Sequence, residues 1–122
     1  MRRIQTYSED GGETFGTTEV VNILAPVTGC QGSVWYSIAK GALYYVGPAS
    51  LNILFRKNLT LFRSMDQGKT WETMFQIREG ESGYTAFAEF GGKLVLAYES
   101  SPRTELAIKP DRIVYVDLGI DL

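Results

Sequence analysis

The stretches Ser8-Glu9-Asp10-Gly11-Gly12-Glu13-Thr14-Phe15 and Ser64-Met65-Asp66-Gln67-Gly68-Lys69-Thr70-Trp71 share the pattern S-x-D-x-G-x-T-aromatic. Five fixed positions recur, which indicates an internal repeat. Each stretch predicts the corner of a β-hairpin: the Asp accepts hydrogen bonds from turn amides, the Gly adopts a positive φ, and the Ser and Thr hydroxyls bind other backbone groups. The final aromatic ring is expected to pack against the fold. We expect both stretches to be architectural.

Apolar runs separated by turn residues fill the rest of the chain. The runs are rich in Val, Ile, Tyr, Phe and Trp and are bounded by Gly, Pro, Asp, Ser and Thr, which is typical of strands joined by turns. No segment has the periodicity of an amphipathic helix. The predicted strands are residues 4–8, 19–24, 30–38, 43–47, 58–63, 73–78, 84–90, 93–100 and 112–118.

The apolar pattern within the runs predicts how the sheets pack. Residues 59–63 and 113–117 alternate in polarity, which predicts strands with one buried face, whereas residues 94–98 are apolar enough to be buried on both faces. This mixture favours antiparallel sheets packed face to face. The Gly91-Gly92 pair between two apolar runs predicts a tight hairpin.

The composition excludes several kinds of chemistry. The 122 residues include no His and one Cys, which excludes imidazole-dependent triads, His-containing zinc sites and internal disulfides. Cys30 is expected to be a small buried apolar residue. The net charge of −2, without a basic stripe, argues against nucleic acid as a partner. No carboxylate cluster has a cation-binding spacing, so we predict neither a metal site nor a cofactor.

The chain shows no targeting or membrane-spanning signal. Arg2 and Arg3 are not followed by an apolar run, so the start does not have the pattern of a secretory signal peptide. The longest apolar stretches are too short to span a bilayer. We therefore expect a soluble chain with no transmembrane segment.

Taken together with other motifs, the repeat resembles that of a known enzyme family. The octapeptide is similar to the Asp box, or bacterial neuraminidase repeat, found at hairpins of β-propeller blades. Residues 26–34 resemble the P-x-C-Q-G-S segment that follows an Asp box in sialidases. In order, Arg56-Lys57-Asn58-Leu59-Thr60-Leu61 precedes the second box, and Gly80-Glu81-Ser82-Gly83-Tyr84 and Leu94-Val95-Leu96-Ala97-Tyr98-Glu99 follow it. Across nearly its whole length, the chain resembles the C-terminal half of an exo-α-sialidase, and the likeness is greatest to the animal lysosomal members of the family.

The resemblance implies an all-β fold in which antiparallel sheets form two to three blades of a six-bladed sialidase-type β-propeller. Residues 1–122 would be the C-terminal part of that domain, because a blade takes roughly 40–50 residues. The implied activity is hydrolysis of terminal α-linked sialic acids from glycoproteins, gangliosides and oligosaccharides. The implied partners are sialylated glycans, and the implied location is the lysosome.

Three residues match functional positions of the family. Tyr84 matches the nucleophile, a phenol that approaches the carboxylate-bearing anomeric carbon with less repulsion than a second carboxylate would. Arg56 matches the third of three arginines that bind the substrate carboxylate, and Glu99 matches a carboxylate that orients the first of them. Arg3 matches a structural arginine that precedes the box. The architectural box positions are Ser8, Asp10, Gly12, Thr14, Phe15, Ser64, Asp66, Gly68, Thr70 and Trp71.

The family's other catalytic groups would lie in segments preceding this chain. These are the remaining arginines, the Asp acid/base and the Glu that accepts the tyrosine proton, so we expect a C-terminal fragment that is inactive alone. Open sheet faces and edges predict instability or self-association. Two alternatives remain: a non-catalytic Asp-box module that binds glycans or a protein, and a self-contained β-sandwich with two similar turns.

Overall fold

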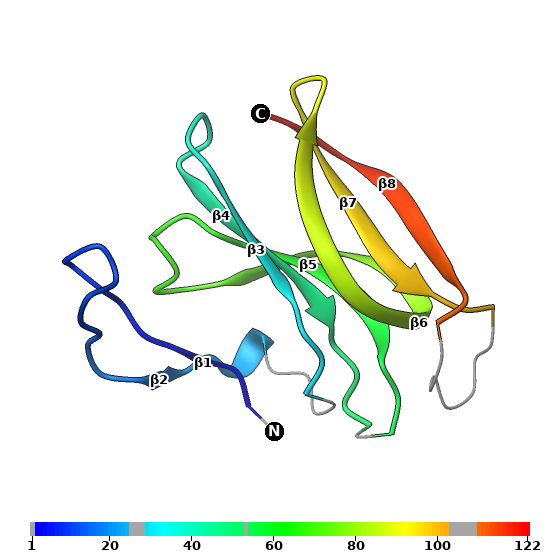
Figure 1. Ribbon diagram of the computed structural model, residues 1–122, viewed down its shortest axis with the longest axis horizontal. Helices are drawn as coiled ribbons and strands as arrows, with labels where there is room; N and C mark the ends of the chain where they lie inside the picture. The colour runs from blue at the N-terminus through cyan, green and yellow to red at the C-terminus, as the bar shows by residue number, and fades with distance from the viewer. Residues whose placement is uncertain (1, 25–28, 53, 103–109) are drawn as a thin grey trace.

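The computed structural model describes residues 2–24, 29–52, 54–102 and 110–122 and is built from antiparallel strands. The predicted sialidase-like segment 26–34 therefore lies partly outside the described residues. Strands β1 (Ile4–Gln5) and β2 (Glu19–Val20) form a two-stranded sheet, and η1 (Asn22–Leu24) is a short 3-10 turn. The other six strands form one curled sheet in chain order (Figure 1). They are β3 (Ser33–Ser37), β4 (Ala42–Pro48), β5 (Lys57–Ser64), β6 (Glu72–Phe90), β7 (Lys93–Ser100) and β8 (Arg112–Asp121).

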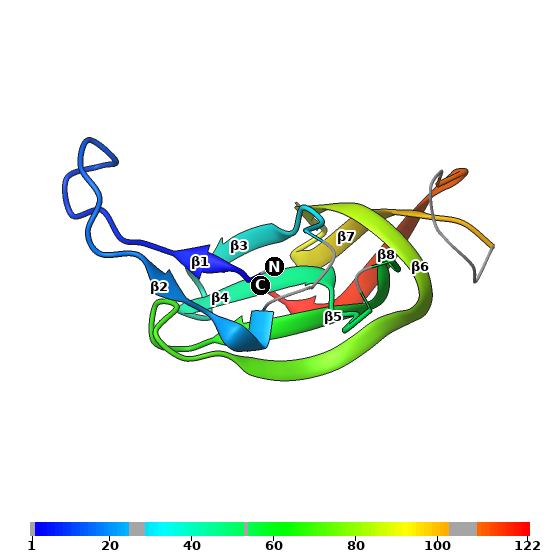
Figure 2. The ribbon, with the colours of Figure 1, turned by 90° about the horizontal axis from the view of Figure 1, so that it is seen from below.

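Strand β6 differs most from the sequence prediction. The two strands predicted at 73–78 and 84–90 are one continuous strand of 19 residues. Its first half pairs with β5 and its second half with β7, and Figure 2 shows it curving from one sheet to the other. The segment between the halves stays extended because it keeps partners there: Glu81 pairs with Lys57, and the Ser82 N–H donates to the Arg56 carbonyl at 2.9 Å.

The curled sheet has the form of consecutive propeller blades. Strands β3, β4, β5 and the first half of β6 make a four-stranded antiparallel meander, and the second half of β6 begins the next sheet with β7 and β8. The two parts pack face to face, as predicted. Their shared core consists of Ala42, Tyr44, Val46, Leu59, Leu61, Leu94, Leu96, Tyr98 and Leu118.

The opposite face of the meander is also covered. Leu24, Tyr45 and Phe62 form a second cluster there, against which Trp71 packs. The half-buried prediction for residues 59–63 is therefore wrong: Leu61 lies in one cluster and Phe62 in the other. The alternation predicted for residues 113–117 is confirmed, because β8 exposes every second side chain there. The predicted strand at 19–24 is shorter, because Leu24 N–H donates to the Val21 carbonyl and closes η1.

Both Asp boxes have the same hydrogen bonds. In the second box, Ser64 Oγ accepts the Gly68 N–H at 2.8 Å, and Asp66 Oδ1 accepts the Ser64 hydroxyl and the Thr70 N–H at 2.8 Å each. The Thr70 hydroxyl donates to Asp66 Oδ2 at 2.6 Å, so it binds the carboxylate rather than the backbone group expected from the sequence. The first box, from Ser8 to Thr14, repeats these contacts within 0.1 Å. Both turns need positive φ, at Gly11 and Gly12 and at Gln67 and Gly68.

The two box aromatics differ in their packing. Trp71 packs beside Tyr45 with ring centroids 6.3 Å apart and an interplanar angle of 75°. Phe15 is 64% exposed, so the expectation that both rings pack against the fold is wrong for the first box. The physical reason is that β1 and β2 form a sheet of only two strands within the described residues, and no sheet face covers the ring.

The boxes make stability depend on pH in the acid range. Hydrogen bonds, chiefly from Thr70, lower the pKa of Asp66 to about 2, and those from Thr14 lower the pKa of Asp10. Because an unfolded Asp has a pKa of about 3.9, these carboxylates stabilise the fold above that pH and lose their contribution as the pH falls toward about 2. We expect the urea midpoint to fall over this range, and Asp66→Asn to flatten the fall.

The matched control is Asp121→Asn, which removes an exposed carboxylate at the end of β8, outside the boxes. It should leave the pH profile of the midpoint like that of the wild type. Equal flattening by both substitutions would show that net charge, rather than the box, sets the acid response.

Candidate functional site

Arg56 and Tyr84 meet where β6 passes from its pairing with β5 to its pairing with β7. Arg56 lies directly before β5, and Tyr84 lies in the middle of β6. The guanidinium carbon of Arg56 is 5.5 Å from the centroid of the Tyr84 ring, a cation–π contact. Tyr84 is 51% exposed, so its side chain is accessible to a ligand.

Glu99 completes this group from β7. Its Oε2 accepts the Tyr84 N–H at 3.2 Å. The approach requires the glycine at 83, because a Cβ there would lie 2.7 Å from the same oxygen. The three residues chosen from the sequence thus come together from three segments, although Glu99 contacts the backbone of Tyr84 rather than its phenol.

The backbone around Tyr84 departs from a regular ladder. The pairing of β6 with β7 shifts register between Ser82 and Thr85. Thr85 is held from the other side by side chains of the Gln31–Ser33 segment. Sequence reasoning assigned no role to Gln31 or Ser33; their only signal was the likeness of residues 26–34 to a sialidase segment.

Cys30 and Arg3 lie close to Arg56 and Glu99 of the site. Cys30 is buried, as expected, and its burial raises the pKa of the thiol, opposed by the charges of Arg56 and Arg3. The Arg3 guanidinium donates to the Cys30 carbonyl, and its carbon lies 5.6 Å from the Tyr45 ring centroid. These contacts tie the segment before β1 to the blade.

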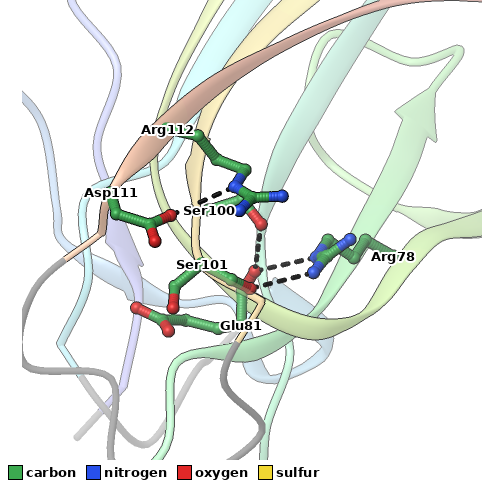
Figure 3. A network of polar contacts seen from close by, with 6 residues as sticks. All are labelled: Arg78, Glu81, Ser100, Ser101, Asp111 and Arg112. Carbon is green, nitrogen blue, oxygen red and sulfur yellow. Dashed lines mark hydrogen bonds and ion pairs between the residues drawn. The ribbon is translucent and has the colours of Figure 1, made fainter.

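Figure 3 shows a second polar network, at the point where β6 bends toward β7. Arg78 Nε donates to the Glu81 carbonyl at 2.9 Å, and Arg78 Nη2 donates to the Ser101 carbonyl at 3.0 Å. The Ser100 hydroxyl donates to the Glu81 carbonyl at 3.0 Å. Arg78 thereby ties β6 to the end of β7 just before the segment that carries Tyr84. No sequence motif marks Arg78.

Two shallow pockets adjoin the site and share Glu99 and Ile113. One has a volume of about 170 Å³ and the other about 310 Å³. The first is lined by Tyr84, Thr85, Ala86, Ala97, Tyr98, Glu99 and Ile113. The second is lined by Glu99, Pro110, Asp111, Arg112 and Ile113. Arg56 lines neither pocket. The capacity to receive an anionic ligand therefore rests on the guanidinium of Arg56 beside the exposed Tyr84 ring.

The remaining features concern metals and membranes. Among the residues that the structure describes, no group of three or more Cys, Asp or Glu side chains is arranged to hold a metal ion. In the same part of the chain, no helix has the length and apolar character needed to cross a membrane.

The comparison with protein families agrees with the repeated boxes and the antiparallel sheets. A search of curated proteins finds no match to the chain. The family model described as "BNR repeat-like domain" matches residues 1–106, which include both Asp boxes and the segments that carry Arg56, Tyr84 and Glu99. Because this match covers most of the chain, the protein belongs to the BNR repeat-like domain family.

Proposed function

We propose that this chain carries part of the active site of an exo-α-sialidase, which removes terminal α-linked sialic acids from glycoproteins, gangliosides and oligosaccharides. The observation that carries the proposal is the meeting of Arg56, Tyr84 and Glu99. Membership of the BNR repeat-like family and the order of the sialidase-like segments support it.

The charges of the site suit a sugar that bears a carboxylate at its reacting carbon. A guanidinium binds a carboxylate through two parallel hydrogen bonds, and Arg56 is the cation beside Tyr84. A neutral phenol can approach the same carbon with less repulsion than a carboxylate nucleophile would. We therefore assign the sugar carboxylate to Arg56 and attack on the anomeric carbon to Tyr84.

In the proposed step, a bond forms between Tyr84 Oη and the anomeric carbon as the bond to the leaving oxygen breaks. The phenol proton goes to a base, and an acid protonates the leaving oxygen, which departs as an alcohol. Water then cleaves the tyrosyl intermediate with overall retention. Glu99 accepts the Tyr84 backbone N–H, so we assign it a supporting role and leave the acid and base to other groups.

The experiment is a titration of the 122-residue chain with N-acetylneuraminic acid, followed by NMR of the Tyr84 and Glu99 amides. We expect saturable shifts at both, because the sugar carboxylate reaches Arg56. N-acetylmannosamine, a related sugar without the carboxylate, is the matched ligand and should shift neither. Equal shifts with both sugars, or none with either, would contradict the proposal.

A fluorogenic sialoside, assayed with the wild type and Tyr84→Phe, measures turnover in parallel. We expect none from this chain alone, because a phenol without its base loses several orders of magnitude in rate. Turnover that disappears in Tyr84→Phe would support Tyr84 as the nucleophile but contradict the expected lack of a base.

A second candidate is a non-catalytic module that binds sialylated glycans. It is favoured by the contact of Glu99 with the Tyr84 backbone rather than the phenol. Turnover that disappears in Tyr84→Phe would exclude such a module.

A further inference from the structure

We infer that Gln31 is a positioning residue for Tyr84, acting through the backbone of Thr85. The side-chain oxygen and nitrogen of Gln31 both form hydrogen bonds with the backbone of one residue, Thr85. Gln31 Oε1 accepts the Thr85 N–H at 3.0 Å, and Gln31 Nε2 donates to the Thr85 carbonyl at 3.2 Å. This pair of bonds is the one that a neighbouring antiparallel strand would supply, so the side chain replaces a strand partner.

Ser33 strengthens the same contact. Its hydroxyl donates to the Thr85 carbonyl at 2.5 Å and accepts the Thr85 hydroxyl at 2.9 Å. Thr85 is buried, so leaving its backbone N–H and carbonyl without these partners would destabilise the folded state. The segment before β3 is thereby joined to the second half of β6, the half that pairs with β7.

Tyr84 lies between this contact and Glu99. On one side Glu99 accepts the Tyr84 N–H, and on the other Gln31 holds the next residue. The pairing of β6 with β7 shifts register between Ser82 and Thr85, so Tyr84 has no partner of its own in β7, and the regular ladder resumes at Thr85, which pairs with Tyr98. The position of the Tyr84 ring beside Arg56 therefore depends on Glu99 on one flank and on how Thr85 is held on the other.

The consequence for catalysis rests on the proposed function, whereas the positioning itself does not. A nucleophile must be held close to its productive geometry, and a small displacement lowers the rate strongly. Gln31 contacts Thr85 rather than the phenol, so its effect passes through the backbone.

The test compares the full chain with Gln31→Ala and Gln31→Glu, using two readouts. The first is amide hydrogen exchange at Thr85, and the second is the ¹⁹F spectrum of 3-fluorotyrosine placed at position 84. We expect Gln31→Ala to speed Thr85 exchange by about tenfold and to shift the ¹⁹F signal. Gln76→Ala, which truncates an exposed glutamine in the first half of β6, is the matched control and should change neither.

Gln31→Glu keeps the size of the side chain and adds a pH signature. A protonated carboxyl can donate to the Thr85 carbonyl as the amide does, whereas the ionised form places two acceptors opposite each other. We expect Gln31→Glu to behave like the wild type below about pH 4 and like Gln31→Ala at neutral pH. Glu99, Arg56 and Arg3 are the charged groups that act on the neighbouring Cys30 and are common to all variants, so each variant is compared with the wild type at the same pH.

The two proposals fail separately. Unchanged Thr85 exchange and ¹⁹F signal in Gln31→Ala would overturn the positioning role, whether or not the chain binds N-acetylneuraminic acid. Altered signals in Gln31→Ala that Gln31→Glu restores at acid pH would establish the role, even if the wild type bound no sugar. A general loss of folding would change amide exchange throughout the sheets and would not be rescued by acid, and this result also counts against a local role.

Discussion

Replacing Leu61 with alanine is expected to lower the free energy of unfolding by about 2–5 kcal/mol. Leu61 is fully buried in β5, in the cluster shared by the two parts of the curled sheet. The substitution removes apolar contacts and leaves a cavity where the sheets meet. Because a small domain is stable by only about 5–15 kcal/mol, this one change removes a large share of the total. Urea unfolding followed by tryptophan fluorescence measures the loss.

The control is Leu51→Ala, the same substitution at a side chain that is 88% exposed. It should alter the free energy of unfolding by no more than about 0.5 kcal/mol. Phe62→Ala, on the opposite face of β5, should cost about as much as Leu61→Ala, because its ring fills the second cluster. A loss below about 1 kcal/mol at Leu61 would show that the two sheets do not share a core.

Replacing Arg56 with methionine is expected to weaken binding of N-acetylneuraminic acid by about 10- to 100-fold. Charge-assisted hydrogen bonds contribute about 1.5–3 kcal/mol, and each 1.4 kcal/mol is tenfold in affinity. Methionine keeps an unbranched side chain beside the Tyr84 ring but removes the charge and the donors. Arg56→Lys should recover only part of the affinity, since an ammonium cannot form the bidentate pair. The titration is followed at the Tyr84 amide.

Lys57→Met is the matched control, because it removes the same charge from the next residue. Lys57 lies over the Phe55 ring, with its Nζ 5.5 Å from the centroid, rather than over Tyr84. We expect the dissociation constant of Lys57→Met to stay within about twofold of that of the wild type, because the half-buried Lys57 lies over Phe55 and does not contact Tyr84. Equal weakening by Lys57→Met would show that net charge attracts the sugar and that Arg56 does not bind its carboxylate.

Most strands could be predicted from the sequence because apolar runs and turn residues act locally. Gly91-Gly92 joins β6 to β7 with both glycines at positive φ, as that pair predicts. The break predicted before Tyr84 was wrong because Gly80 and Gly83 are typical of turns but here lie within β6. The alternation of residues 59–63 was also misleading, since it cannot show whether another part of the chain covers the polar face.

The residues of the candidate site could be chosen from the sequence, but their arrangement in space could not. Arg56, Tyr84 and Glu99 were chosen by likeness to a family, and the structure places them together. Gln31 lies in a segment that resembles the family, but its contact could not be predicted from that likeness, because its partner is a backbone segment 54 residues away. Nothing in the local pattern around Gln31 specifies that contact.

The sequence by itself determined the Asp boxes, since their hydrogen bonds join residues no more than four positions apart and depend on the octapeptide alone. It also determined most of the strands, because polarity patterns and turn residues act over short distances. Only the tertiary structure decided that Trp71 is covered while Phe15 is exposed, and that Gln31 reaches Thr85. These outcomes depend on which distant segments meet as the sheet curls, and the pairing of strands far apart in the chain is not encoded in any one of them.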